Sequence, residues 1–238
     1  MNRLKDKVAI ITGGSSGIGL AAANKFIAEG ASVISADIAA PENKNIDFVK
    51  TDVTNPQSLQ DMVNTVVDQY GKIDILVANA GVAEKKSAVA DLDLDNWNKV
   101  IAIDLTGVVL TNKYVVSQMV KQKSGSVINM SSILGVVGGV KSQAYSAAKA
   151  GVANYTRSQA ITYAAQGIRF NSVAPGYVNT PLLKTLPQKV RASMIEKMPI
   201  GRLAEPEEIA NVIAFVASDE ASFVTGALIN ADGGYTAQ

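Results

Sequence analysis

The fold is decided near the amino terminus by the stretch Thr12-Gly13-Gly14-Ser15-Ser16-Gly17-Ile18-Gly19-Leu20-Ala21-Ala22. It follows an apolar run of strand length, 8–12, and a helical pattern continues after it to Gly30. Within it, Gly17-x-Gly19-x-x-Ala22 has the spacing at which glycines permit a tight turn and let backbone N–H groups approach a pyrophosphate at a helix N-terminus. The strand before the glycines and the helix after them are the context that this mechanism needs. The stretch therefore predicts a dinucleotide-binding turn.

The rest of the chain repeats this pattern of strand and helix. Further β-branched or apolar runs alternate with stretches of helical length, and these runs are 32–37, 74–78, 126–130 and 168–174. Continuous apolar strands that alternate with helices indicate a parallel sheet with both faces covered. Asn55-Pro56 and Glu205-Pro206 supply ordinary helix starts. We expect residues 1–238 to form a single α/β domain, a doubly wound parallel sheet of Rossmann type with helices on both faces.

The composition excludes several classes of function. The 238 residues carry 22 Lys plus Arg against 21 Asp plus Glu, so no basic excess favours a nucleic-acid partner. The chain has no histidine and no cysteine, which removes serine–histidine hydrolysis, thiol nucleophiles and zinc sites of the usual kind. Its polar start is unlike a signal peptide, and we find no run of eighteen apolar residues. We expect a soluble cytoplasmic protein without a membrane or nucleic-acid partner and without a catalytic metal.

Asp37, at the end of the second strand, bears on which dinucleotide would bind. A carboxylate there can accept hydrogen bonds from both adenosine ribose hydroxyls, whereas a 2′-phosphate would meet charge repulsion. No Lys or Arg occurs between Thr12 and Asn24 to serve as a counterion for that phosphate. We therefore expect NAD rather than NADP; the alternative is that Asp37 is only a strand-end turn residue. Asp52 and Val53, after a third strand, are weaker candidates for contacts with the adenine ring.

Tyr145 and Lys149 are the candidate reactive pair. They stand four positions apart in a segment, 143–165, whose alanine-rich composition predicts a helix, so both side chains share one face. A phenol is a poor proton donor or acceptor near neutral pH unless a fixed cation stabilises the phenolate. Lys149 is placed to be that cation. Ordinary surface helices show the same spacing, and the pair matters here because no histidine is present to act as a base.

Together these motifs resemble the short-chain dehydrogenase/reductase family, and the likeness covers essentially the whole chain. Ser132, Tyr145 and Lys149 match the family's catalytic trio. The segments similar to its nucleotide-binding motifs are Gly13 with Ser15-Ser16-Gly17-Ile18-Gly19, then Asn79-Ala80-Gly81, and finally Pro175-Gly176-x-Val178-x-Thr180.

The resemblance implies hydride transfer between C4 of a nicotinamide and a carbonyl or alcohol carbon. Tyr145 would act as the general acid or base, and Ser132 would hold the same substrate oxygen. Lys149 would bind the nicotinamide ribose and favour the phenolate of Tyr145, so both residues also count as cofactor contacts. Ser131 bears a hydroxyl too, but the spacing to Tyr145 favours Ser132.

Asp104 is a departure from the family pattern, which has an Asn at this position. In the family the backbone carbonyl of that Asn holds a water that links the lysine to solvent. An ionised Asp104 would pair with Lys149, partly cancel its effect on Tyr145 and raise the optimum pH for oxidation. In the interpretation we favour from the sequence, Asp104 substitutes structurally and local N–H groups satisfy its carboxylate.

The residues expected to face the substrate are mostly apolar. They are Leu134, Val136, Val137, Val140, Tyr177, Leu182, Leu183 and Met194. Such a lining suits a small or medium hydrophobic ketone or secondary alcohol, although core packing explains several of these residues equally well. We interpret 181–199, which contains three prolines, as a mobile lid over the substrate, with a plain surface connection as the alternative.

The tail from Asp232 to Gln238 resembles that of bacterial (R)-specific secondary-alcohol dehydrogenases in the family. That branch is tetrameric and can hold structural magnesium near its C-terminal carboxylates. The helix at 98–122, the helix carrying Tyr145 and the apolar end at 223–238 correspond to surfaces that pair between subunits. We therefore expect a homotetramer and leave magnesium at the C-terminus open.

Two other functions stay in view. A 3-oxoacyl carrier-protein reductase would share these motifs, but it usually prefers NADPH, which Asp37 opposes. It also needs basic docking residues around the active site, where this chain has Ser126 and Gln166. An inert NAD-binding module would keep the glycine turn and lose the trio, which is intact here.

Overall fold

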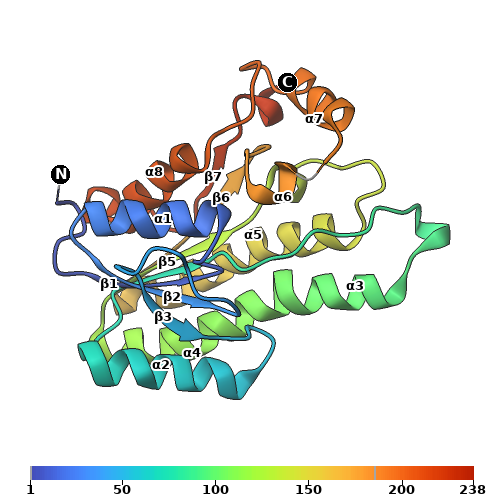
Figure 1. Cartoon of the computed structure of the whole chain (residues 1–238). Helices are drawn as coiled ribbons and strands as arrows, with labels where there is room; N and C mark the ends of the chain where they lie inside the picture. Colours follow the sequence, from blue (N-terminus) through green and yellow to red (C-terminus); the bar gives the residue numbers. More distant parts are fainter. Residues whose placement is uncertain (1, 185) are drawn as a thin grey trace.

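The computed structural model describes residues 2–184 and 186–238, without the side chains of residues 182 and 184. Within these residues, seven parallel strands form one sheet. Its order is β3-β2-β1-β4-β5-β6-β7 (Figure 1). The strands are β1 (Val8–Thr12), β2 (Ser32–Asp37), β3 (Asp47–Lys50), β4 (Ile75–Ala78), β5 (Gly125–Met130), β6 (Ile168–Pro175) and β7 (Leu228–Ala231). The strand order reverses between β1 and β4, which is the switch point of a doubly wound sheet. The predicted Rossmann-type fold is confirmed.

The two edge strands, β3 and β7, were missed from the sequence or left undefined. The interior strands β1 and β4 are buried along their whole length, so they show as continuous apolar runs. β3 is largely exposed and β7 is only partly buried. Because an edge strand has a neighbour on one side only, its sequence lacks the apolar run that marks a buried strand.

Two layers of helices cover the sheet (Figure 1). Helices α1 (Gly17–Ala28) and α8 (Pro206–Ala217) pack on one face. Helices α2 (Pro56–Tyr70), α4 (Gly107–Gln122) and α5 (Ala144–Tyr163) pack on the other. The expected helix starts are confirmed for α2 and α8, which begin at the predicted prolines.

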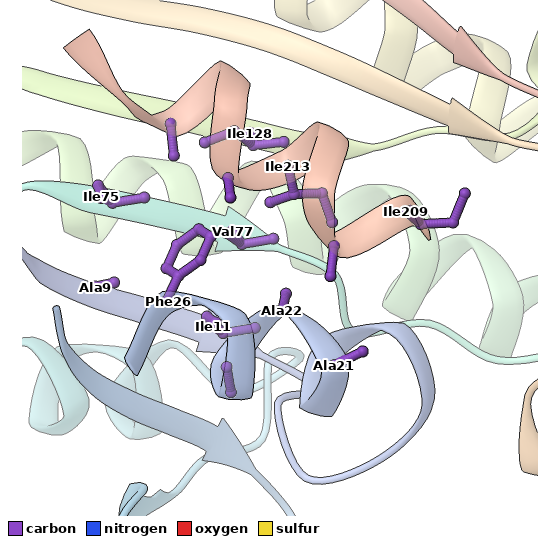
Figure 2. Close-up of a cluster of buried hydrophobic side chains, with 14 of the residues drawn as sticks. Ala9, Ile11, Ala21, Ala22, Phe26, Ile75, Val77, Ile128, Ile209 and Ile213 are labelled. Atoms are coloured by element: carbon purple, nitrogen blue, oxygen red, sulfur yellow. The ribbon is translucent and has the colours of Figure 1, made fainter. Parts of the chain in front are cut away.

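Successive strand residues point into two separate hydrophobic cores. Ile10 belongs to the core under α2, α4 and α5, whereas its neighbour Ile11 belongs to the core under α1 and α8. Figure 2 shows the second of these cores, in which Phe26 of α1 and Ile213 of α8 point toward the strand residues Ile11 and Val77. These packed faces make the sheet a rigid base for the loops at its edges.

One π-helical turn, η2 (Ala102–Thr106), joins α3 (Leu94–Ile101) to α4 in a continuous helix. The helix begins before the predicted residue 98 because Asp93 accepts hydrogen bonds from the first N–H groups. Among the described residues it is long and apolar enough to cross a membrane by length and composition alone, which the search for an uninterrupted apolar run missed. Its buried side chains Val108, Val115, Val116 and Met119 belong to the core under α2, α4 and α5, and that role explains its apolar composition.

The segment 181–199 is more regular than predicted. It contains two short helices, α6 (Pro181–Lys184) and α7 (Gln188–Glu196). Pro187 stands directly before α7, where the missing N–H of proline costs no helical hydrogen bond. Motion of this segment as a lid stays a prediction. The remaining single turns are η1 (Val89–Asp91), η3 (Ile133–Gly135), η4 (Ala164–Gln166), η5 (Asp219–Ala221) and η6 (Tyr235–Ala237).

Candidate active site

The glycine turn and the segment after β4 meet at the carboxyl edge of the sheet, because β1 and β4 are neighbours. Thr12 Oγ1 accepts hydrogen bonds from the N–H groups of Asn79 at 3.0 Å and Ala80 at 3.1 Å. Asn79 Nδ2 in turn donates to the carbonyl oxygens of Thr12 and Gly13, each at 3.1 Å. These bonds fix the glycine turn against β4. The sequence analysis did not predict that the Thr12 side chain would hold the glycine turn against the segment after β4.

The glycines of the turn are required by geometry. Gly13 and Gly17 have φ of 64° and 51°, in the left-handed region. A Cβ on Gly19 would lie 2.1 Å from the carbonyl oxygen of Gly13. Ile18 packs against the core under α1, and Ser16 precedes α1 without a side-chain capping bond. The first N–H groups of α1 are therefore left as donors for an anion such as a pyrophosphate.

Asp37 lies beside the glycine turn at the end of β2. Its Oδ2 accepts a hydrogen bond from Ser15 N–H at 3.1 Å, and its Oδ1 accepts one from Ile38 N–H at 2.7 Å. These bonds hold the carboxylate where an adenosine ribose would follow a pyrophosphate bound at the turn.

Asp52 and Val53 are engaged mainly with the protein. Asp52 Oδ1 accepts hydrogen bonds from the N–H and the hydroxyl of Thr54, at 2.8 and 2.7 Å. Val53 is buried, and a Cβ on Gly107 would lie 2.9 Å from its Cγ2. Both residues shape the turn that leads into α2, so contact with an adenine ring remains a weaker prediction for them.

The segment after β6 reaches the glycine turn from the other side. A Cβ on Gly17 would lie 3.4 Å from Thr180 Cγ2, so the two predicted nucleotide segments are in contact. Pro175 ends β6 and is buried, as is Val178. The N–H of Gly176 donates to the carbonyl at the end of β7 at 3.1 Å. The donors and glycine positions on both sides fit a dinucleotide.

The two serines after β5 have different partners. Ser131 Oγ is buried and donates to the carbonyl oxygen of Lys149 at 2.9 Å. Ser132 Oγ accepts a hydrogen bond from Leu134 N–H at 3.2 Å, so its own proton is available to another acceptor. Ser131 thus ties β5 to α5, and Ser132 is the better candidate for binding a substrate oxygen.

Lys149 contacts both Tyr145 and Asp104, and we call these three residues, together with Ser132 just after β5, the polar cluster. Lys149 Nζ is 5.4 Å from the centre of the Tyr145 ring and donates to Met130 O at 3.1 Å. The same Nζ lies 3.3 Å from Asp104 Oδ2. Lys149 is 4% exposed and Asp104 1%, whereas Tyr145 is half-buried. Solvent therefore screens the ion pair only weakly, and the phenol is the more accessible group.

Asp104 combines features of both interpretations drawn from the sequence. Its Oδ1 accepts a hydrogen bond from Val82 N–H at 2.9 Å, while Oδ2 has no hydrogen bond of good geometry and faces Lys149. Burial raises the pKa of Asp104, and Lys149 and the Val82 N–H act against that rise. Asp104 sits in the π-helical turn η2, and a Cβ on Gly81 would lie 2.9 Å from its Oδ2. Gly81 thus leaves the space that this carboxylate occupies.

Comparisons with known proteins agree with this geometry. A family model described as Enoyl-(Acyl carrier protein) reductase, one of the short-chain alcohol dehydrogenase models, matches residues 13–236. The chain is a member of the short-chain dehydrogenase/reductase family. It is 50% identical to cis-4-hydroxycyclohexanecarboxylate dehydrogenase of Sinomonas cyclohexanicum, over 98% of this chain and 97% of that protein.

Two further comparisons place it within this family. It is 41% identical to the 3-oxoacyl-(acyl-carrier-protein) reductase FabG of Thermotoga maritima, over 98% of both chains. The crystal structure of gox2181 superposes on this chain with a TM-score of 0.95 at 37% identity, covering 100% of this chain and 99% of that one. The protein is an oxidoreductase that acts on alcohols or ketones.

The loop after η3, which follows Ser132 in the chain, carries apolar side chains. Val136, Val137 and Val140 are exposed by 42%, 36% and 82%. Leu134, Leu183 and Met194 are half-buried, and the side chain of Leu182 lies outside the described part of the chain. Tyr177 packs edge-on against Tyr235, and burial raises the pKa of Tyr177 to about 12, so it stays a neutral phenol at physiological pH.

The expected docking positions of a carrier-protein reductase lie away from this site. Ser126 is near the start of β5, and Gln166 lies two residues before β6, so both lie at the amino edge of the sheet. Within this chain they do not border the polar cluster, because residues at the start of a parallel strand lie at the opposite edge of the sheet from those after its end. Arg169 donates to Ser126 Oγ there at 3.1 Å.

In the part of the chain that the structure describes, no group of three or more acidic side chains is placed to hold a metal ion. Asp232, in the tail, accepts hydrogen bonds from the N–H groups of Gly234 and Thr236 and from the Thr236 hydroxyl. Burial opposes its ionisation, but these hydrogen bonds together lower the pKa of Asp232. The magnesium suggested by the tail therefore has no side-chain cluster supporting it.

Proposed function

We propose that this protein is an NAD(H)-dependent dehydrogenase/reductase for a small or medium hydrophobic ketone or secondary alcohol. The observation that carries the proposal is the half-buried Tyr145 beside the buried Lys149, with a Ser132 hydroxyl free to donate. A bound nicotinamide cofactor supplies or accepts the hydride. The protein holds the substrate oxygen and moves a proton at it.

Each residue of the polar cluster has a distinct role in this proposal. In ketone reduction Tyr145 Oη donates a proton to the carbonyl oxygen, and in alcohol oxidation it accepts the hydroxyl proton. Ser132 Oγ donates a hydrogen bond to the same oxygen and stabilises the charge that develops on it. Lys149 favours the phenolate of Tyr145, and Asp104 tempers that effect through the 3.3 Å ion pair.

The preference for NAD rests on Asp37. Its carboxylate is fixed by Ser15 and Ile38 beside the glycine turn, and the turn offers no cation to a 2′-phosphate. A ribose diol can donate hydrogen bonds to this carboxylate, whereas a phosphate would be repelled by it.

The substrate class rests on the apolar residues near the polar cluster and on a relative. The exposed valines at 136, 137 and 140 give an apolar entrance. The relative from Sinomonas cyclohexanicum is named for an alicyclic secondary alcohol. We infer that the substrate is a ketone or alcohol of similar size, with an alicyclic ring as the first choice.

The same chemistry on an acyl-carrier-protein substrate is the second candidate. The reductase from Thermotoga maritima supports it by similarity. Asp37 counts against it, because NADPH carries an additional phosphate that this carboxylate would repel.

We also propose a cytoplasmic homotetramer. Ile161 on α5 is 85% exposed and Phe223 before β7 is fully exposed, which is unusual for large apolar side chains. Both lie on surfaces expected to meet a second copy. Sedimentation equilibrium should give a tetramer, and a stable monomer at micromolar concentration would contradict this assembly.

A cofactor-resolved activity screen tests the function. NADH and NADPH are each offered with cyclohexanone-type ketones, acetoin-type diketones, aryl ketones, sugars and an acetoacetyl thioester. We expect NADH-dependent reduction of the alicyclic or other hydrophobic ketones. Strict NADPH dependence, or turnover of the thioester alone, would refute this proposal in favour of the second candidate.

A further inference from the structure

The first turn of α5, which carries Tyr145, is capped from a distant segment. Gln143, the residue before the helix, makes no side-chain capping bond. Glu84 does so instead: its Oε2 accepts hydrogen bonds from the N–H groups of Gln143 at 2.9 Å and Tyr145 at 3.1 Å. Glu84 lies 59 residues before Gln143 and 61 residues before Tyr145, so no local sequence motif could predict this contact.

Glu84 belongs to a segment, 82–87, that links the polar cluster to the loop before α5. At its start, Val82 N–H donates to Asp104 Oδ1 at 2.9 Å. At its end, Ser87 N–H donates to Lys141 O at 3.2 Å, and Ser87 O accepts from Gln143 Nε2 at 3.2 Å. The segment therefore contacts both Asp104 and the start of α5. Among the hydrogen bonds of the described residues, Glu84 is the only charged side chain of this segment that bonds to the start of the helix.

The contact should be strong for physical reasons. The first N–H groups of a helix have no partner within the helix, and a carboxylate that accepts them gains charge-assisted hydrogen bonds and a favourable interaction with the helix dipole. Glu84 is half-buried, so solvent screens the interaction less than on an open surface.

The contact acts on Tyr145 more directly than on Lys149. The bonded N–H is that of Tyr145 itself, so Glu84 fixes the backbone from which the phenol projects. Lys149 lies one turn further along and is held separately by Met130 and Asp104. Loss of the cap would therefore loosen the phenol while the lysine keeps its partners.

We propose that Glu84 is a positioning residue that holds the Tyr145 phenol in register with Ser132. The proposal rests on the role given above to Tyr145 as the acid or base. Under this proposal, Ser132, Tyr145 and Lys149 are not sufficient for activity. The segment after β4 must also hold the first turn of α5 in place.

The test compares Glu84→Ala with Glu84→Gln in the full-length enzyme. Alanine removes both acceptors, whereas the glutamine amide oxygen can accept the same N–H groups without the charge. We expect Glu84→Ala to lower kcat about tenfold with the KM for NADH unchanged, as loss of a helix cap predicts. Glu84→Gln should keep kcat within about threefold of the parent, because the amide oxygen keeps both hydrogen bonds and loses only the part of their strength that comes from the charge.

Two further variants serve as controls. Lys86→Ala changes an exposed side chain in the same segment, and Asp68→Asn makes the same charge change on the exposed face of α2. Both should leave kcat and the KM for NADH at parent values.

Hydrogen exchange of the peptide 141–149 gives a readout that does not depend on activity. It should exchange about tenfold faster in Glu84→Ala than in Glu84→Gln, while peptides of the glycine turn stay unchanged. Parent-like kcat and exchange in Glu84→Ala would overturn the proposal. So would equal impairment of both Glu84 variants, or parallel losses of kcat, NADH affinity and melting temperature. If Tyr145→Phe retained turnover, the proposed function would fail, but the exchange experiment would still test the clamp.

Discussion

The glycine turn, residues 12–19, and the polar cluster are built in opposite ways. The turn is one contiguous piece of chain whose conformation depends on backbone angles and missing Cβ atoms. The cluster brings together side chains from η2, the end of β5 and α5, and its properties depend on buried charge. A turn of this kind can be recognised in a sequence because residues that are close in space are also close in the chain. For a cluster, the sequence can suggest candidate residues but not the contacts between them.

This difference predicts that substitutions in the glycine turn and substitutions in the polar cluster affect different properties of the enzyme. Damage to the turn should weaken cofactor binding, since that is the only function assigned to it. Damage to Tyr145 or Asp104 should slow the chemical step or shift its pH dependence, while Lys149 still holds the cofactor.

Tyr145→Phe should give the largest effect. Removing the phenolic hydroxyl takes away the proposed acid or base, so kcat should fall by about a thousandfold. The affinity for NADH, measured by fluorescence titration, should change little because the ring and Lys149 remain. Tyr163→Phe is the matched control, since Tyr163 ends the same helix and stacks on Phe170 through its ring. Joint loss of turnover and NADH binding would mean that turn and cluster are not independent.

Gly19→Ala should damage the turn. The new methyl would lie 2.1 Å from the carbonyl oxygen of Gly13, so the backbone must shift. A strain of about 1–3 kcal/mol corresponds to NADH binding weakened by about 5- to 150-fold. Gly138→Ala is the control, because a Cβ there meets nothing within 4 Å. Unchanged NADH affinity in a folded Gly19→Ala protein would contradict the reading of this turn.

Asp37→Ser should change which cofactor is used. Without the carboxylate a 2′-phosphate is no longer repelled, so the ratio of kcat/KM for NADPH to that for NADH should rise about tenfold or more. The comparison variant is Asp52→Ser, whose carboxylate is bonded to Thr54 and should leave the ratio nearly unchanged. Equal effects of both substitutions would mean that Asp37 has no special place near the ribose.

Asp104→Asn should give the smallest effect, seen in the pH–rate profile for alcohol oxidation. Above its raised pKa the Asp104 carboxylate is charged and weakens the effect of Lys149 on the Tyr145 phenolate. Below that pKa the carboxyl group is neutral and has no such effect. Asparagine is neutral at every pH, so the rising limb of the profile should move to lower pH by about one unit or less. Parent and variant should converge as the pH falls. An unmoved limb would leave Asp104 with a structural role only.

The sequence predicted the interior strands well, because burial on both faces requires continuous apolar runs. It missed the edge strands, for which burial is partial. Among site residues, local spacing was enough to single out the glycine turn, Asp37, and the pair Tyr145 and Lys149. Spacing could prefer Ser132 to Ser131, but the physical reason came from the bond between Ser131 Oγ and the Lys149 carbonyl.

By itself, then, the sequence determined the type of sheet, and it predicted the nucleotide turn and the residues proposed to do the chemistry. These follow from strand burial, backbone freedom and functional groups, which are properties of short stretches of chain. Only the tertiary structure decided that Asp104 faces Lys149 at 3.3 Å and that Glu84 caps the helix carrying Tyr145. Those contacts join residues 45 and 61 positions apart (149 − 104 and 145 − 84), and packing of the helices on the sheet sets their distances.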